Sequence, residues 1–268
     1  MSVLLGAVAV SAAAAAAASA RWNWWRPHAD GVPILMYHRI GDPPPGSRLR
    51  KLWVAESDFR RQLETVLSLG YETVFASRLA DPASLPAKPL VVTFDDGTED
   101  NFHAAFPILK ALGVKATVFL VADWMGRRNG WEDPADEPWQ RTLTWEAARE
   151  MQDSGLVEFG SHTMTHPDLR RLEGDALSYE LAESKRRLET TLGRRVDAFA
   201  YPFGAGAYDP AVRAAVLAAG YSCDFGVKQG LAPRAWTAAS GPMKRLLVRR
   251  DDTLLDLRLN LSRGKARL

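Results

Sequence analysis

The segment that decides the fold is Leu90-Val91-Val92-Thr93-Phe94-Asp95-Asp96-Gly97. An apolar, β-branched run of this kind predicts a buried strand at 90–94, and the strand stops abruptly at two acids and a glycine. Two adjacent carboxylates repel each other, and it is costly to remove them from water without compensation. A bound cation would offset that cost. One aspartate would then be a metal ligand, and its neighbour would remain free to act as a base.

Outward from this strand, short apolar runs alternate with segments of helical periodicity. The predicted strands are 33–37, 71–75, 90–94, 115–121, 156–160, 198–201, 221–225 and 245–249. Helices are predicted from a cap at Ser57 or Asp58 to Gly70, and at 101–112, 144–153, 175–192, 210–219 and 253–261. This alternation predicts a parallel α/β sheet with right-handed crossovers. A closed barrel would gather the carboxyl ends of the strands on one face, but an open doubly wound sheet fits the same alternation.

Length and composition indicate one globular domain. The chain has 268 residues, of which 47% are hydrophobic and 25% charged, enough for a single sizeable core. The net charge of +2 is nearly neutral for this size and does not indicate a nucleic-acid partner. Cys223 is the single cysteine, so no intrachain disulfide can form.

The N-terminus predicts export. Residues 2–20 carry no charge and end in Ala18-Ser19-Ala20, which fits a signal-peptidase site. The tryptophans and arginines at 21–26 are also typical of an interfacial membrane anchor. We therefore expect a signal peptide or membrane anchor at 1–26 and a catalytic domain at 27–268, located in the periplasm, at the cell surface or anchored facing outward. A low-complexity tail is the alternative.

A second polar group follows the predicted strand at 156–160. It is Ser161-His162-Thr163-Met164-Thr165-His166. On one turn of a helix, two histidines at this spacing face the same side and can reach one metal ion. With a carboxylate from the aspartate pair they would form a site with open coordination positions. Zinc suits these ligands, and cobalt, iron or manganese remain alternatives.

Two further segments are open to more than one interpretation. The turn Phe199-Ala200-Tyr201-Pro202-Phe203-Gly204 would form either an apolar wall with backbone N–H groups aimed at a reacting carbonyl, or an ordinary strand-to-turn connection. The loop at 124–143 is rich in tryptophan. Its indoles would either stack on sugar rings or brace the loop.

The segments 93–97, 161–166 and 199–204, in this order and spacing, resemble the first three motifs of the polysaccharide deacetylases. This family shares the NodB homology domain and forms carbohydrate esterase family 4. The resemblance covers about 32–260 and implies a distorted (β/α) barrel of about seven parallel strands. It also implies metal-dependent removal of acetyl groups from N-acetylated sugars. The residues it implies are Asp95 as general base, Asp96, His162 and His166 as metal ligands, and Tyr201, Pro202 and Phe203 as substrate-binding residues.

The chain departs from this family pattern in two places. Ala200 stands where the third motif usually carries an arginine that orients the base. No histidine follows His166, although the last motif of the family usually supplies one as the acid. Arg245, on the last predicted strand, is a candidate for the missing cation.

A subgroup of the family suggests a source for the missing acid. The segment 33–38 ends in Tyr37-His38, and it resembles the first strand of deacetylases that act on poly-β-1,6-N-acetylglucosamine. The first and last strands of a closed barrel are neighbours, so we expect His38 to replace the missing histidine as the acid. A histidine bonded within its own loop is the alternative. His28 and His103 are expected to be structural or exposed.

The sequence thus favours an exported, metal-dependent N-deacetylase, most simply zinc-dependent. Its predicted partner is an N-acetylglucosamine-containing polysaccharide, either poly-β-1,6-linked or peptidoglycan-like, with membrane association through the N-terminal segment. One alternative is a deacylase of a small molecule or glycolipid on the same scaffold. The other is an inactive carbohydrate-binding homologue, for which a paired base and metal site would serve no purpose.

Overall fold

The structure is a computed structural model that describes residue 19 and residues 22–267. The predicted signal peptide or anchor therefore lies largely outside the described residues. Among those that are described, no helix combines the length and the apolar character needed to cross a bilayer.

Seven parallel strands close into a barrel, which confirms the predicted architecture. In order around the barrel they are β1 (Ile34–Tyr37), β5 (Pro89–Phe94), β6 (Ala116–Leu120), β7 (Val157–Ser161), β8 (Ala198–Ala200), β9 (Cys223–Gln229) and β10 (Met243–Leu247). The barrel closes because β1 pairs with β5 on one side and with β10 on the other. This pairing excludes the open doubly wound sheet.

The barrel is distorted at β5. Its first residues pair with an additional strand, β4 (Glu72–Val74), and its last residues pair with β6. A short separate pair, β2 (Arg39–Ile40) and β3 (Trp53–Val54), follows β1. β2 carries the residues directly after His38 away from the barrel.

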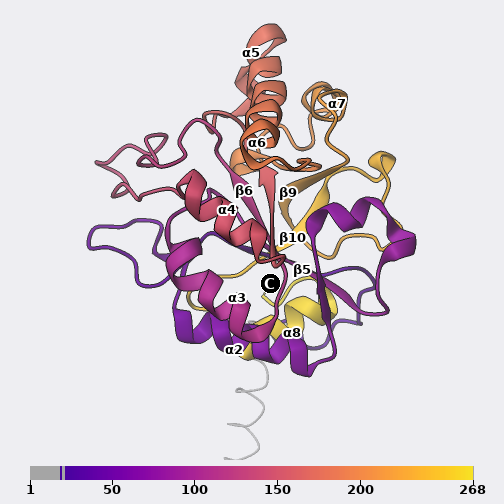
Figure 1. Cartoon of the computed structure of the whole chain (residues 1–268). Coiled ribbons are helices and arrows are strands. Elements are labelled where there is room, and N and C mark those ends of the chain that lie inside the picture. The colour runs from indigo at the N-terminus through magenta and orange to yellow at the C-terminus, as the bar shows by residue number, and fades with distance from the viewer. Residues whose placement is uncertain (1–18, 20–21, 268) are drawn as a thin grey trace, which may run out of the picture.

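Helices surround the barrel on the outside (Figure 1). They are α2 (Glu56–Ser68), α3 (Phe106–Leu112), α4 (Trp145–Asp153), α5 (Gly174–Ser178), α6 (Ser184–Leu192), α7 (Pro210–Ala218) and α8 (Leu254–Arg263). A π-helical turn precedes α3 at Asn101–Ala105, and another joins α5 to α6 at Tyr179–Glu183. The predicted cap of α2 is wrong: Ala55 occupies the N-cap, and Ser57 and Asp58 lie within the first turn.

Alternation along β5 separates the two sides of the barrel wall. Leu90, Val92 and Phe94 pack in the cluster between strands and helices, whereas Val91 belongs to the cluster that includes the barrel interior. The same alternation turns Thr93 and Asp95 inward. The buried strand therefore delivers its first acid to the inside of the barrel at the carboxyl end.

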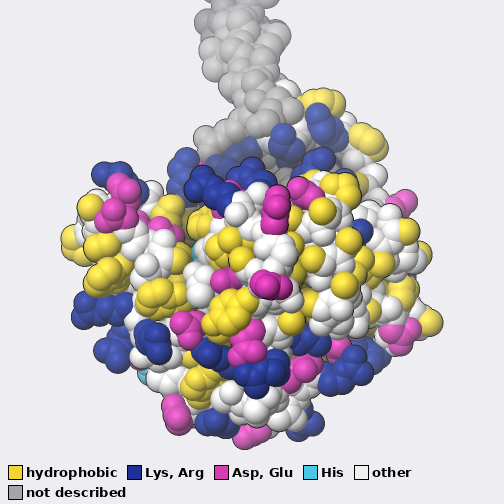
Figure 2. Space-filling view, turned by 90° about the horizontal axis from the view of Figure 1, so that it is seen from above, with side chains coloured by type: hydrophobic (Ala, Val, Ile, Leu, Met, Phe, Trp, Pro, Cys, Tyr) yellow, Lys and Arg dark blue, Asp and Glu magenta, His cyan; other side chains and the backbone are white. Residues whose placement is uncertain are grey.

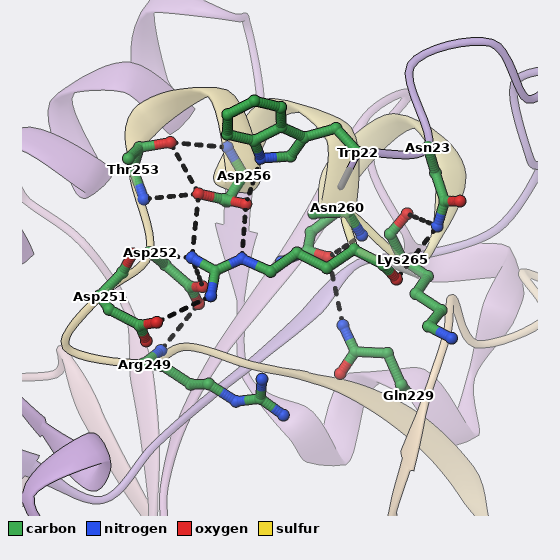
Figure 3. A network of polar contacts seen from close by, with 12 residues as sticks. Trp22, Asn23, Gln229, Arg249, Asp251, Asp252, Thr253, Asp256, Asn260 and Lys265 are labelled. Atoms are coloured by element: carbon green, nitrogen blue, oxygen red, sulfur yellow. Dashed lines mark hydrogen bonds and ion pairs between the residues drawn. The ribbon is translucent and has the colours of Figure 1, made fainter. Parts of the chain in front are cut away.

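Residues 22 and 23 pack against the C-terminal segment 256–267 (Figure 3). Trp22 donates from Nε1 to Oδ1 of Asp256 at 2.9 Å. The buried side chain of Asn23 donates to the carbonyls of Lys265 and Arg267 at 3.1 and 3.2 Å. The segment 22–26, which the sequence assigned to the N-terminal extension, is therefore in contact with the barrel domain.

The surface carries charges of both signs. From above, Lys and Arg side chains gather along the upper edge of the view, and over the rest of that face they alternate with Asp and Glu (Figure 2). This mixture agrees with the nearly neutral net charge of the chain.

Candidate active site

The two adjacent aspartates face different partners. Asp95 binds Arg245 of β10 through two contacts, 2.6 Å from Nη1 to Oδ1 and 2.7 Å from Nη2 to Oδ2. Both side chains are almost completely buried. Arg245 is itself held by the carbonyl of Gly226, which accepts from Nε at 2.9 Å. The predicted candidate for the missing cation is therefore in direct contact with Asp95.

Asp96 instead faces the two histidines of the second motif. Its Oδ1 lies 3.7 Å from His162 Nε2 and 3.4 Å from His166 Nε2. Ligands at about 2.0–2.1 Å from a tetrahedral zinc ion stand about 3.3 Å apart, so these separations suit one metal ion. The three ligand atoms all lie within 4.8 Å of one another and are buried. The predicted ligand set is thus brought together and fits a divalent metal.

A backbone carbonyl fixes the orientation of His162. Its Nδ1 lies 2.7 Å from the carbonyl oxygen of Ala200, which can only accept a hydrogen bond, so Nδ1 carries the proton. Nε2 is therefore left for the metal. Burial lowers the pKa of His162 to about 4, so the ring is neutral near pH 7, as a metal ligand must be. The position that lacks the family's usual arginine thus supplies a carbonyl for this purpose.

Aromatic rings hold His166. Trp131 stacks on its imidazole with 4.8 Å between ring centroids, and Phe203 meets it edge-on at 4.6 Å. Trp124 packs on Trp131 in turn. Of the two interpretations of the tryptophan-rich loop, bracing is therefore observed for Trp131. Trp139, which is 44% exposed, remains available to a ligand.

The histidine motif is a loop, and the prediction of a helical turn is wrong. Thr163 and His166 have φ values of 70° and 68°, outside the helical region. The buried carboxylate of Glu180 accepts from the backbone N–H groups of Met164 and Thr165 at 2.8 and 2.9 Å. It therefore satisfies donors that a helix would otherwise use internally.

Backbone strain is concentrated in the three motifs. Within residue 19 and 22–267, the non-glycine residues with positive φ are Asp96, Thr163, His166 and Phe203. All four fall in the segments that the sequence singled out. Such conformations cost about 1–3 kcal/mol each and persist where the surrounding structure enforces them, often at functional sites.

A second buried arginine, Arg39, was missed by the sequence analysis. Its guanidinium is fully buried and lies 3.8 Å from Oδ2 of Asp96. Its nitrogen atoms have no hydrogen-bond acceptor among the residues that the structure describes. Each of the two adjacent acids therefore faces its own buried guanidinium. The sequence signal was the Arg directly after His38, which composition alone does not distinguish from a surface arginine.

The groups around the two acids keep both of them ionised. Burial opposes the ionisation of Asp95, but Arg245 outweighs it and holds the pKa of that carboxyl below its ordinary value. Burial also opposes the ionisation of Asp96, and the His166 imidazole holds its pKa far below the ordinary value. Both groups are therefore carboxylates near neutral pH.

His38 lies beside the acids, as the barrel closure predicts. It directly follows β1, and the carbonyl of its neighbour Tyr37 accepts from the backbone N–H of Asp95 at 3.0 Å. Burial lowers the pKa of His38, while the charges of Asp95 and Asp96 act in the opposite direction. Its Nδ1 has no hydrogen-bond partner within the described part of the chain. The alternative of a histidine bonded within its loop by this atom is therefore not observed.

The third motif contributes less surface than expected. The ring of Tyr201 is fully buried and donates to Oδ2 of Asp224 at 2.9 Å, so its side chain does not line an open site. Pro202 is also buried. Phe203 is 62% exposed and is the side chain of this motif that reaches solvent beside His166.

Comparison with known proteins agrees with this geometry. The family model for polysaccharide deacetylase matches residues 83–223, more than half of the chain, including the first three motifs. The chain belongs to the polysaccharide deacetylase family. This deacetylase is 29% identical over 207 residues to YxkH of Bacillus subtilis (strain 168), a protein assigned to the same family. That match spans 76% of the chain and 67% of YxkH.

Two further relatives extend the comparison. The poly-beta-1,6-N-acetyl-D-glucosamine N-deacetylase of Escherichia coli (strain K12) is 29% identical over 150 residues, which make up 51% of this chain and 21% of that protein. The solved structure of Streptococcus pyogenes deacetylase PplD in complex with acetate matches with a TM-score of 0.73 and 27% identity. It covers 87% of this deacetylase and 98% of PplD.

Proposed function

We propose that this deacetylase removes acetyl groups from an N-acetylglucosamine polysaccharide, poly-β-1,6-linked or peptidoglycan-like, in a metal-dependent reaction. The observation that carries the proposal is the division between the two adjacent aspartates. Asp95 is oriented by Arg245, whereas Asp96 faces His162 and His166. One acid is thus placed for proton transfer and the other for metal binding.

Asp96, His162 and His166 would hold the metal, and their mixed nitrogen and oxygen donors favour zinc. When bound, a divalent metal polarises the amide carbonyl and the attacking water. The neighbouring Arg39 neutralises part of the charge on Asp96 from the side of Oδ2.

Asp95 would accept the proton of the attacking water. Arg245 donates to both carboxylate oxygens of Asp95 and so fixes the orientation of the carboxylate. The oxygen that accepts the proton is therefore presented to the water in a defined direction. Positioned bases of this kind contribute about 10²–10⁴-fold to a rate. The arginine also keeps Asp95 deprotonated in the resting enzyme, which is the form that a base needs.

His38 would donate a proton to the nitrogen of the leaving amine, so that acetate and a free glucosamine unit are released. Its place at the end of β1, next to the strand that carries Arg245, puts it on the same barrel edge as Asp95. Burial lowers the pKa of His38, and the charges of Asp95 and Asp96 act against this by favouring the protonated imidazole.

The polymeric substrate is supported by sequence and surface. The printed name of the Escherichia coli relative specifies poly-β-1,6-N-acetyl-D-glucosamine. Phe203 beside His166 and Trp139 on the neighbouring loop expose aromatic faces, on which the apolar faces of pyranose rings can stack. The uncharged segment 2–20 supports an exported location, where such polymers occur.

Acetate release tests the proposal. The protein lacking residues 1–20 would be incubated with β-1,6- and β-1,4-linked N-acetylglucosamine oligomers and with peptidoglycan, with added zinc or cobalt. Release from an oligomer, abolished in Asp95→Asn, would support a polysaccharide N-deacetylase. Absence of release from all three, from a protein that holds metal, would contradict it and favour a small-molecule or glycolipid substrate.

A further inference from the structure

A hollow with positive walls lies at the end of the barrel opposite the candidate active site. Its volume is about 490 Å³. The lining includes Gly31 before β1, Tyr71 before β4 and the first residue of β5, Pro89. These positions mark the amino ends of the parallel strands, whereas Asp95, His38 and His162 follow the carboxyl ends. The hollow and the catalytic residues therefore face away from each other.

The positive charges of this hollow are not neutralised by ion pairs. Lys88, Arg234 and Arg258 line it, together with His28 and a single acid, Asp30. In the part of the chain that the structure covers, no carboxylate lies within 4.0 Å of those three cations. Carbonyl groups hold two of them: Lys88 donates to Leu69 at 2.6 Å, and Arg234 to Pro86 at 2.7 Å. Carbonyls fix a cation without removing its net charge.

The segment that carries two exposed indoles is held beside this hollow. Trp24 and Trp25 are 52% and 53% exposed. Arg263, at the end of α8, donates to the carbonyl of Trp24 at 2.9 Å and to that of Arg26 at 2.8 Å. Ser262, the residue before Arg263 on α8, lines the hollow. The end of α8 therefore contacts both the hollow and the segment 24–26. Tryptophan beside arginine is the composition that proteins place at the level of lipid headgroups.

We propose that this end of the barrel docks on an anionic phospholipid bilayer. The docking face consists of Trp24, Trp25, Arg26, Lys88, Arg234, Arg258 and Arg263. Headgroup phosphates would enter the hollow between Lys88, Arg234 and Arg258, and the two indoles would enter the interfacial layer. This inference concerns the opposite end of the molecule and does not depend on the proposed reaction.

Two observations favour a bilayer as the occupant. The uncharged, mostly apolar segment 2–20 directly precedes the docking face in the sequence. Contact through this face also directs the carboxyl ends of the strands, with Asp95 and His166, away from the lipid. The catalytic groups would then point toward material outside the bilayer.

Vesicle sedimentation of the full chain tests the proposal. Binding would be measured to phosphatidylcholine vesicles and to vesicles with about one-third phosphatidylglycerol. We expect the anionic lipid to strengthen binding, and this gain to shrink as salt is raised. In Arg234→Glu/Arg258→Glu the gain should fall by about tenfold or more, with binding to phosphatidylcholine unchanged. In Trp24→Ala/Trp25→Ala, binding to both kinds of vesicle should weaken.

The matched control is Arg170→Glu/Arg171→Glu, which reverses two exposed arginines on the loop after the histidine motif, at the carboxyl end of the barrel. In this control variant, anionic lipid should strengthen vesicle binding as much as in the unaltered protein. Thermal unfolding would verify that each variant is folded. Equal gain in Arg234→Glu/Arg258→Glu and in the control, or no gain in the unaltered protein, would overturn the proposal. Full suppression of vesicle binding by millimolar inorganic phosphate at constant ionic strength would overturn it as well, in favour of a soluble anion.

Discussion

Asp95 and Arg245 are 150 positions apart in the sequence and form a bidentate ion pair inside the barrel, with contacts of 2.6 and 2.7 Å. The pair depends on barrel closure, because Asp95 follows β5 and Arg245 lies on β10, and both strands pair with β1. A planar guanidinium fixes both oxygens of a carboxylate, which a lysine cannot do. The orientation of the proposed base is therefore set by the last strand of the fold.

Arg245→Lys should separate charge from orientation. The positive charge stays, but the second contact to Asp95 is lost, so we expect kcat to fall by about 10–100-fold while zinc affinity stays unchanged. Steady-state acetate release and a chelator competition assay would measure the two quantities. Arg267→Lys, which alters an arginine in a carboxylate cluster that includes no candidate metal ligand, is the control. An unchanged kcat in Arg245→Lys would show that bidentate orientation is unnecessary.

Asp95→Asn and His38→Gln should both slow acetate release without emptying the metal site. We expect a loss of about 10²–10⁴-fold in each, since a positioned proton-transfer group is removed. Metal content after gel filtration should match that of the unaltered protein, because neither residue belongs to the ligand cluster. His103→Gln, at an exposed histidine of the turn before α3, serves as the control. Full activity in His38→Gln would exclude the acid role and leave the metal site unaffected.

Chelator treatment should abolish acetate release, and added zinc should restore it. His166→Ala should lower metal affinity by a larger factor than Glu180→Gln, because Glu180 acts only through the loop that carries His166. A factor of about 10–100 is expected for Glu180→Gln. Isothermal titration with zinc would measure both variants. Unchanged affinity in His166→Ala would contradict the proposed ligand set.

Acid should weaken the contact between the two ends of the chain. Burial opposes the ionisation of Asp256, but hydrogen bonds from Arg267 and Thr253 outweigh it and hold the pKa of Asp256 below its ordinary value of about 4. A carboxylate with a depressed pKa contributes stability that is complete above about pH 4 and is lost as the pH falls further. The difference in thermal stability between the unaltered protein and Asp256→Asn should therefore be constant near neutrality and narrow below pH 4. A constant difference down to pH 2 would contradict the assignment.

Truncation at the predicted domain boundary should destabilise the barrel. A chain that begins at residue 27 loses the Trp22 contact to Asp256 and the hydrogen bonds of the buried Asn23 side chain. Each such bond contributes about 0.5–1.5 kcal/mol. We expect a lower unfolding midpoint in denaturant than for a chain that begins at residue 21. Equal midpoints would mean that these contacts do not stabilise the domain.

The sequence predicted the elements and the clustering of Asp96, His162 and His166 because both follow from local patterns. Leu90–Phe94 is a continuous apolar run before two acids, and His162 and His166 follow another strand, so their place at the carboxyl end of the sheet is a consequence of parallel topology. Closure was predicted only through the family resemblance. The alternation of strands and helices is the same for an open sheet, and the deciding β1–β10 pairing joins residues that no local pattern relates.

Contacts between distant segments were the least predictable. Arg39 occupies a position whose burial depends on the β2–β3 pair, and Glu180 acts on a loop that precedes it by some fifteen residues. The prediction of a helical turn at His162–His166 was wrong because the Glu180 carboxylate accepts from the backbone N–H groups that such a turn would use. The burial of Tyr201 likewise depends on Asp224 of the neighbouring strand β9, which its own motif does not contain.

Barrel closure through β10 has a consequence for biosynthesis. Until residues 243–247 have been made, β1 and β9 each lack one neighbour, and Asp95 lacks Arg245. During most of its synthesis, a nascent chain therefore contains the proposed base, Asp95, without the arginine that orients it. Premature termination between β9 and β10 leaves β1 and β9 each with an unpaired edge, a template for aggregation. Hydrolytic competence is thus acquired in a single late event, when translation has passed the last strand.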